Sequence, residues 1–489
     1  MKTSIIGSGF AGLSTAAILA RNGYSVDVFE KNSQSGGRAR QFKCDGYTFD
    51  MGPSWYWMPD VFDKFFQQFD KTTSDYYELI KLNPGFQVIF DNMSIPIPDS
   101  FEALKILFEN IEPGSAKNLE NFMLQAELKY KFGMDSLVYN PGLSISEFLN
   151  KGIVKNIFKL DLLKSYKTHV ASYFKNPKLR KLLEFPVLFL GTAPKNTPAL
   201  YSLMAYSGFI QGTYYPRGGF YKVIQALQDL CQDLGVNFHN NEDVQKLHVK
   251  RNQVHQLTTS KRDYKTELVV GTADYVHIEQ DLLDRKYHNY SVDYWNKKTF
   301  SPSCLLFYLG VNKKINKLLH HNLFFDSSIE QHIKELYDDK VWPTDPLFYV
   351  CCPSKTDLTV APEGKENLFL LMPITPGLKD TEQLRIHYFD ILIKRLEQYT
   401  GDEISQFIEF KKSYCINDFV QDYNAYKGNA YGLANTLFQT ANFKPSIVNK
   451  KVSNLYYSGQ LTVPGPGVPP ALISGQVVAQ YILQNHSIR

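Results

Sequence analysis

The chain lacks any apolar run long enough to cross a bilayer. Its longest apolar stretches, 303–311 and 367–375, have the length of β-strands, whereas a membrane-spanning helix needs about 20 residues. The N-terminal residues MKTSIIGSGF also lack the basic and apolar regions of a secretory signal and lead directly into a strand and a glycine turn. We therefore expect a cytoplasmic protein that does not span a membrane.

Cysteine is scarce and the charges nearly cancel. The six cysteines occur without paired spacing or companion histidines, which argues against a disulfide framework or a zinc site and for a reducing compartment. The 53 basic and 49 acidic side chains leave a formal net charge of +4. This balance gives no reason to expect a nucleic-acid partner, and we expect no bound metal.

Aromatic side chains, by contrast, are abundant. The 34 Phe and 31 Tyr bring the aromatic content to 14%, which favours broad, stiff apolar walls. With 489 residues, 44% of them hydrophobic, the chain is long enough for two or three domains.

The N-terminus carries a strand, a glycine turn and a helix in succession. Residues 3–6 are predicted to form a short strand that ends in two isoleucines, GSGFAG follows at 7–12, and residues 13–22 have helical composition. A second strand ends at Glu30, 18 residues after Gly12. This spacing fits a dinucleotide fingerprint, in which Gly7 allows the tight turn, Gly9 admits a pyrophosphate and Gly12 lets the helix pack on the strand. Glu30 would bind the ribose hydroxyls. The alternative is a glycine-rich turn in an unrelated α/β domain.

A second glycine pair distinguishes between possible dinucleotides. Gly36, Gly37 and Arg38 follow Glu30 and Lys31 within a few residues. This arrangement resembles the superfamily of flavin-dependent amine oxidases and carotenoid desaturases, in which the GGR segment lies along the FAD diphosphate. A guanidinium beside a diphosphate is also chemically reasonable by itself. We therefore expect FAD rather than NAD.

The C-terminus resembles that of bacterial phytoene desaturases. A strand at 455–458 leads to Gly459 and Gln460, then to PGPGVP at 464–469 and to a helix that begins near Pro469 or Pro470. The helix N-terminus would face the flavin. Many relatives carry Thr-His before the PGPGVP segment, whereas this chain has Thr462 and Val463, so a role for that histidine is not transferred.

Two further segments resemble parts of the same superfamily. Residues 214–249 match a helix and strands that return to the nucleotide domain, with Val244 at the position whose backbone meets the adenine. The DMGP sequence at 50–53 matches an element that passes close to the flavin ring. Directly after it, Trp55, Tyr56 and Trp57 are predicted to line the inner end of a substrate tunnel; the alternative is ordinary core.

The resemblance implies an α/β fold: a discontinuous, Rossmann-like FAD-binding domain (1–95, 214–290 and 430–489), and a mixed-sheet substrate domain with a helical membrane-associating part (96–213 and 291–429). The expected cofactor contacts are Gly7, Gly9, Ala11, Gly12, Glu30, Lys31, Gly37, Arg38, Gly52, Pro53, Val244, Gly459, Gln460, Gly467 and Val468.

A basic segment at 151–184 suggests where a membrane would lie. Nine Lys/Arg and two acidic residues give it a charge of +7, and aromatic and leucine side chains alternate with the cations. Such a pattern is typical of a helix in a membrane interface, although a solvated helix packed on the core reads similarly.

The resemblance also implies a reaction. Bacterial phytoene desaturases remove a hydride and a proton from a C40 polyene taken from the membrane, and their reduced flavin passes electrons to oxygen or a quinone. The sequence does not identify a catalytic residue. The alternatives are a 1-hydroxycarotenoid 3,4-desaturase of the same family, an amine oxidase, and a flavin-free prenyl-lipid carrier of the same fold.

Overall fold

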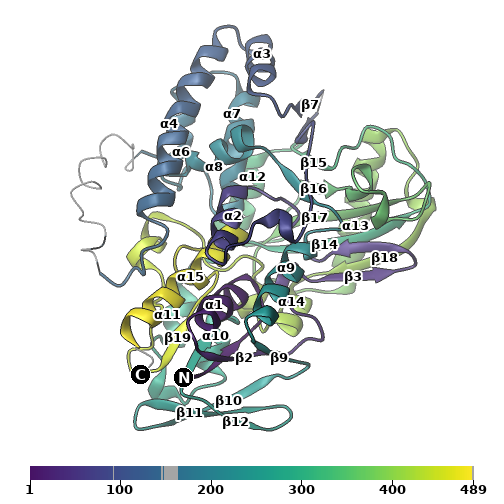
Figure 1. Cartoon of the computed structure of the whole chain (residues 1–489). Helices are drawn as coiled ribbons and strands as arrows, with labels where there is room; N and C mark the ends of the chain where they lie inside the picture. Colours follow the sequence, from purple (N-terminus) through teal and green to yellow (C-terminus); the bar gives the residue numbers. More distant parts are fainter. Residues whose placement is uncertain (92, 145–146, 148–163, 487–489) are drawn as a thin grey trace.

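A five-stranded parallel sheet lies in the lower part of the molecule, above the ribbon of β10, β11 and β12 (residues 244–265) in the view of Figure 1. The computed structural model describes all residues except 92, 145–146, 148–163 and 487–489. The sheet order is β19-β13-β1-β2-β9, and β1 pairs Thr3 with Leu268 on one side and with Val26 on the other. The strands are β1 (Lys2–Ile6), β2 (Ser25–Glu30), β9 (Asn237–Asn240), β13 (Leu268–Gly271) and β19 (Leu455–Tyr457).

Helices pack on one face of this sheet and a β-meander on the other. The helices are α1 (Phe10–Arg21), α9 (Tyr221–Asp233) and α15 (Val468–Asn485). The meander consists of β10 (Val244–Lys250), β11 (Gln253–Thr259) and β12 (Asp263–Lys265). Both faces of the sheet are therefore covered, which explains why β1 is buried after its first residue and why β13 is apolar and buried throughout.

The second large sheet is mixed and has seven strands in the order β18-β14-β17-β16-β15-β6-β7. Its strands are β6 (Phe86–Phe90), β7 (Met93–Ile97), β14 (Ser303–Val311), β15 (His321–Phe324), β16 (Phe348–Cys351), β17 (Glu366–Ile374) and β18 (Ile408–Tyr414). The sequence-based division assigned residues 1–95 to the FAD-binding part, but β6 and β7 pair with this sheet instead. The sequence of the short strand β6 does not indicate which distant strand it pairs with.

Alternation along these strands separates two environments. Cys304 and Leu306 of β14 lie in the same apolar cluster as α1, α9 and α15, whereas Leu305 and Phe307 pack with α13 (Glu382–Thr400). Adjacent Cys351 and Cys352 likewise fall into different clusters, as expected for neighbours in extended backbone. One face of the sheet is thus available to line a cavity.

The remaining elements cover the edges and the top of the molecule (Figure 1). Short ribbons are β3 (Gln41–Cys44) with β4 (Tyr47–Asp50), and β5 (Leu79–Lys81) with β8 (Tyr214–Pro216). The other helices are α2 (Pro59–Gln67), α3 (Phe101–Ile111), α4 (Ser115–Ser136), α6 (Tyr166–Ala171), α7 (Pro177–Glu184), α8 (Leu203–Tyr206), α10 (Tyr275–Gln280), α11 (Val292–Lys297), α12 (Ile329–Lys334) and α14 (Ile416–Tyr423).

The basic segment at 151–184 falls partly outside the described residues, which resume at 164. In the described half, Tyr166, Phe174 and Leu182 are fully buried. These apolar side chains face the protein, so α6 and α7 do not present them to lipid. Within the part of the chain that the structure describes, no helix combines the length and the apolar character of a membrane span.

Candidate flavin and substrate site

The glycine turn between β1 and α1 forms one end of a cavity. Gly7 has a φ of +103° and donates its N–H to Phe29 O at 2.8 Å. A Cβ on Gly12 would lie 2.1 Å from Gly7 O, so only glycine allows the helix to pass this close to the turn. A Cβ on Gly9 would meet nothing within 4 Å. Since no side chain caps α1, its first N–H groups are available to an anion.

Glu30 closes the second strand beside this turn. Its Oε2 accepts hydrogen bonds from Ser8 N at 3.2 Å and Ser8 Oγ at 2.7 Å, and its Oε1 accepts from Asn32 N at 3.0 Å. The side chain of Lys31 donates a hydrogen bond from Nζ to Gln421 O at 2.7 Å. The carboxylate is therefore held at the cavity edge by its own neighbours, and its contact with the ribose stays a prediction from the sequence.

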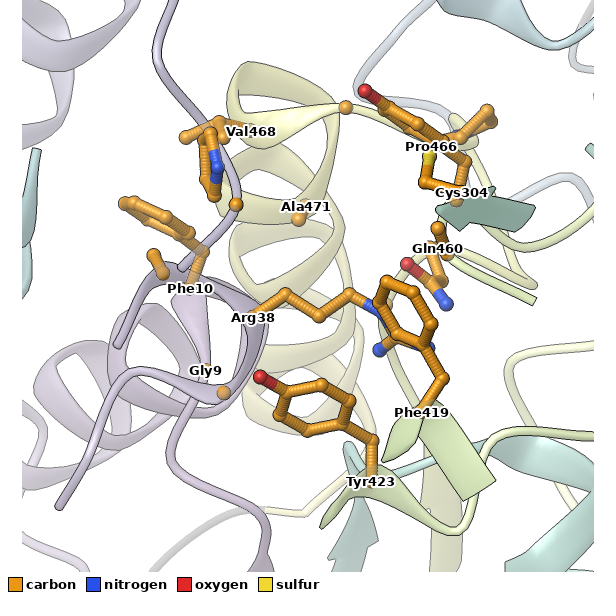
Figure 2. A pocket seen from close by; sticks show the side chains of 18 of the residues that line it. Gly9, Phe10, Arg38, Cys304, Phe419, Tyr423, Gln460, Pro466, Val468 and Ala471 are labelled. Atoms are coloured by element: carbon orange, nitrogen blue, oxygen red, sulfur yellow. The ribbon is translucent and has the colours of Figure 1, made fainter. Parts of the chain in front are cut away.

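Arg38 extends across the cavity from the side of Gly9 toward Phe419 (Figure 2). Its Nη2 donates to Asn429 O at 3.0 Å, and the guanidinium lies 5.1 Å from the centre of the Tyr423 ring. The buried Nε has no hydrogen-bond partner among the described residues. Burial lowers the pKa of Arg38, against the opposing field of Asp274. A buried cation with an unused donor fits an anionic ligand such as the FAD diphosphate.

The C-terminal motif forms the opposite side of the cavity. Gly459, at a φ of +118°, donates its N–H to Ser474 Oγ at 2.9 Å, and Gln460 Nε2 donates to Asn429 Oδ1 at 3.1 Å. Gly467 precedes α15, whose N-terminus has no side-chain cap. This end of α15 therefore offers free N–H groups and a positive dipole end to the cavity.

Helices α1 and α15 pack in close contact behind the site. A Cβ on Gly475 would lie 2.4 Å from Ala11 O and 1.9 Å from Ser14 Oγ. Ser14 Oγ in turn donates to Leu472 O at 2.9 Å. The two helix N-termini are thus held in a fixed relation on either side of the cavity.

The cavity has a volume of about 440 Å³ and joins the predicted cofactor contacts to the substrate side. Gly12 does not line it, in keeping with a packing role. The predicted contacts that do line it are Gly7, Gly9, Ala11, Glu30, Lys31, Gly37, Arg38, Gly52, Pro53, Val244, Gly459, Gln460, Gly467 and Val468.

The three aromatic residues after Pro53 have different positions. Trp55 and Trp57 line the cavity, with their rings 5.4 Å apart. Trp57 Nε1 donates to Thr213 Oγ1 at 2.9 Å. Tyr56 does not line the cavity: it is fully buried, and its hydroxyl bonds that of Tyr77 at 2.8 Å. The alternation of extended backbone accounts for this, since the middle residue points the other way.

The sequence did not reveal a cluster of polar side chains beside Trp55. One nitrogen each of His320 and His321 and the sulfur of Cys351 lie within 4.8 Å of one another, all buried. Tyr349 OH lies 2.6 Å from His321 Nδ1 and 3.0 Å from Ser54 Oγ. Residues 321 and 351 are partners in the β15–β16 register, a pairing that no local sequence pattern shows.

The fold and the cavity define a class of flavoenzyme. The chain matches the Flavin containing amine oxidoreductase family over residues 10–483 and so belongs to this family of FAD-dependent oxidoreductases. Within it, the chain is one of the carotenoid desaturases. It is 37% identical to the carotenoid 3,4-desaturase of Haloarcula japonica, over 99% of this chain and 98% of the relative.

Two other similarities place the chain in this family and fold. It is 29% identical to the zeta-carotene-forming phytoene desaturase of Myxococcus xanthus, over 98% of this chain and 93% of the relative. The structure of a putrescine oxidase bound to putrescine superposes with a TM-score of 0.65 and 13% identity, over 99% of each chain. The FAD-dependent desaturase family and the FAD cofactor predicted from the sequence are confirmed.

Proposed function

We propose that the protein introduces double bonds into an acyclic C40 carotenoid. The observation that carries this proposal is one continuous cavity, formed by described residues, that runs from the nucleotide turn to an apolar wall. That wall includes Trp55, Trp57, Phe185, Phe325 and Leu371. A long hydrocarbon would gain favourable burial along it and would present its C–H bonds to the flavin end.

The residues that line the cavity indicate which roles the cofactor and the protein would each have in the reaction. Bound FAD would accept a hydride from the substrate. The N-terminus of α1 and Arg38 would bind its diphosphate, and the aromatic wall would position the polyene and exclude water. Among the described lining residues, the carboxylates all lie at the nucleotide end: Glu30, Glu242, Asp243, Asp274 and Asp422.

The lining therefore offers no carboxylate base at the substrate end of the described cavity. A strong base is not required, because a positive charge spread along a polyene makes the neighbouring C–H acidic. Electrons would then pass to oxygen or a quinone. We assign no catalytic base.

Two substrates fit the proposal. The sequence favours phytoene through its WYW segment, and the relative from Myxococcus xanthus is named for that substrate. The 37% identity to a carotenoid 3,4-desaturase favours the other candidate, desaturation at the end of a more oxidised chain. Purified yellow protein should be given phytoene, lycopene and end-hydroxylated lycopene in liposomes. A shifted visible spectrum for any of them supports the proposal, and a flavin-containing protein inactive on all of them contradicts it.

Replacing Trp55 by alanine tests the aromatic wall. The indole stacks on the His321 ring at 4.1 Å and 10° and is partly exposed to the cavity. Its loss removes a large apolar contact, so we expect turnover of the polyene to fall about tenfold or more, with FAD content unchanged. Turnover and bound flavin are measured on the same preparation.

The matched control is Trp342→Ala. Trp342 also stacks on an aromatic ring, Tyr388, at 5.0 Å, but lies on the α13 side of the mixed sheet and does not line the cavity. It should lower stability without changing turnover per bound flavin. Equal turnover losses in both variants would refute a specific role for Trp55.

An exposed apolar surface suggests how the enzyme takes the polyene from a membrane. We therefore propose that the protein associates peripherally with the bilayer. Phe438 and Phe443 are 75% and 58% exposed. Tyr139 and Leu143 are also exposed and come from a segment in which Gly142 packs against Ala441. Exposed aromatic and leucine side chains of this kind insert into the interface of a bilayer.

The double variant Phe438→Ser/Phe443→Ser should bind liposomes at least about tenfold more weakly, because two large apolar groups no longer enter the lipid. Flotation with liposomes of mixed anionic and neutral lipid measures this. Leu358→Ser is the control, since Leu358 is 81% exposed but belongs to a different segment. Unchanged flotation of the double variant would show that this surface does not face the membrane.

A further inference from the structure

Two polar side chains that line the cavity and one buried behind them form a hydrogen-bonded chain. Tyr349 OH lies 3.0 Å from Ser54 Oγ and 2.6 Å from His321 Nδ1. Ser54 follows Gly52 and Pro53, which belong to the predicted flavin contacts, and Tyr349 and His321 come from the neighbouring strands β16 and β15. The register pairs Leu323 with Tyr349, so the two ring-bearing residues are diagonal neighbours on one face of the sheet.

This hydrogen-bonded chain of side chains begins at the cavity and ends in the protein interior. Ser54 and Tyr349 both line the cavity, and Ser54 is partly exposed there. His321 is fully buried behind them and is held by the stacked indole of Trp55. Ser54 is therefore the member of the chain that a bound molecule would meet.

His321 is a neutral imidazole in this position. Burial lowers its pKa well below the usual value, and the neighbouring His320 lowers it further. A neutral imidazole has one donor and one acceptor, and its Nε2 has no partner among the described residues. The two hydroxyls can reverse together, so Ser54 Oγ is able either to donate or to accept a hydrogen bond. This dual capacity matches an alcohol.

The hydrogen-bonded chain differs from His332, one of the histidines that line the cavity. The Nε2 of His332 donates to Pro373 O at 3.0 Å and its Nδ1 accepts from Leu347 N at 2.8 Å. Both nitrogens are occupied by the backbone, so His332 has nothing left for a ligand. Ser54 retains capacity at a wall that is otherwise largely hydrocarbon.

We propose that Ser54, Tyr349 and His321 form a specificity subsite that receives a hydroxyl at the end of the substrate and so selects an end-hydroxylated acyclic carotenoid over the hydrocarbon. This inference rests on the proposed function and narrows its substrate class. A hydroxyl buried in an apolar tunnel is unfavourable unless it is paired, and this subsite pairs it. We expect a preference of about ten- to a hundredfold, because the subsite is already bonded internally when no hydroxyl is present.

The test uses two probes that differ in one group: lycopene, and lycopene hydrated at one end to a tertiary alcohol. The holoenzyme should show a kcat/KM at least about tenfold higher for the alcohol. Tyr349→Phe should remove most of this preference by lowering kcat/KM for the alcohol far more than kcat/KM for lycopene. Ser54→Ala should do the same with a smaller change in volume.

The control is Tyr337→Phe. Tyr337 lines the same cavity but has no part in the hydrogen-bonded chain, so its loss should leave the preference intact. Flavin content and thermal stability are checked for every variant. If a variant fails to hold flavin, binding of the two probes is compared instead through quenching of tryptophan fluorescence, to which Trp55 and Trp57 in the wall contribute.

The outcomes distinguish recognition of a hydroxyl from a role of these side chains in proton transfer, and they test the proposed function separately. An equal fall in kcat/KM for both probes in Tyr349→Phe would indicate that the three side chains act in proton transfer, and it would overturn the inference. A holoenzyme without preference for the alcohol would also overturn it. If the holoenzyme desaturates no carotenoid, the proposed function fails. The binding comparison then still decides whether the subsite recognises a hydroxyl: tighter binding of the alcohol that Tyr349→Phe abolishes supports it, and equal binding refutes it.

Discussion

Gly12→Ala is expected to abolish FAD binding. The added Cβ would lie 2.1 Å from Gly7 O and 2.8 Å from Thr272 Oγ1, and the first of these is a backbone atom that cannot move aside alone. Helix α1 would have to shift away from the glycine turn, which removes the N–H groups that face the diphosphate. Forced packing of this kind also costs about 1–3 kcal/mol of stability. The flavin absorbance per polypeptide measures the effect.

Gly133→Ala is the matched control for this change. Gly133 also lies within a helix, α4, and its nearest contact for a Cβ is a flexible methyl group, Leu203 Cδ2, at 3.3 Å. Alanine is the better helix former, so stability should be unchanged or slightly higher and flavin content normal. A Gly12→Ala protein that retains a full complement of flavin would show that α1 does not bind the diphosphate as inferred here.

Arg38→Met should weaken FAD binding about a hundredfold, because it removes charge-assisted hydrogen bonds to the diphosphate from a buried position. Methionine keeps much of the length of the side chain and its contact with the Tyr423 ring. The loss is therefore one of charge and donors rather than of volume. Titration of the deflavinated protein with FAD, followed by flavin fluorescence, gives the dissociation constant.

Arg38→Lys distinguishes the charge from the shape of the guanidinium. Lysine retains the positive charge but not the planar set of donors that bonds Asn429 O and leaves Nε for a ligand. Its affinity should fall between those of the wild type and Arg38→Met. An unchanged affinity in Arg38→Met would place the diphosphate elsewhere in the cavity.

The elements that carry the nucleotide turn were predictable because their constraints are local. The spacing of Gly7, Gly9 and Gly12 is a requirement of a strand that turns directly into a helix, and the structure places them there. Burial on both faces similarly makes β13 of the parallel sheet and β14 of the mixed sheet continuous apolar runs that stand out in the sequence.

The substrate end was less predictable because it depends on pairing over long distances. His321 meets Tyr349 only through the register of β15 and β16, and Ser54 joins them from far away in the chain. Alternation within WYW is visible in the sequence, yet which of its two faces meets the cavity depends on the neighbouring strands. For the same reason, Tyr166 and Phe174 contributed to the prediction of a lipid-facing helix although the fold buries both.

The position of the C-terminal motif also sets the order of events during synthesis. Gly459, Gln460, Gly467 and Val468 line the cavity from the loop between β19 and α15, and β19 forms an edge of the parallel sheet. A ribosome makes these residues after all the other residues that line the cavity, so the nascent chain displays its glycine turn long before it can enclose a cofactor. We therefore expect flavin loading to be a late step of maturation. A message truncated before β19 would yield an apoprotein that added riboflavin does not rescue.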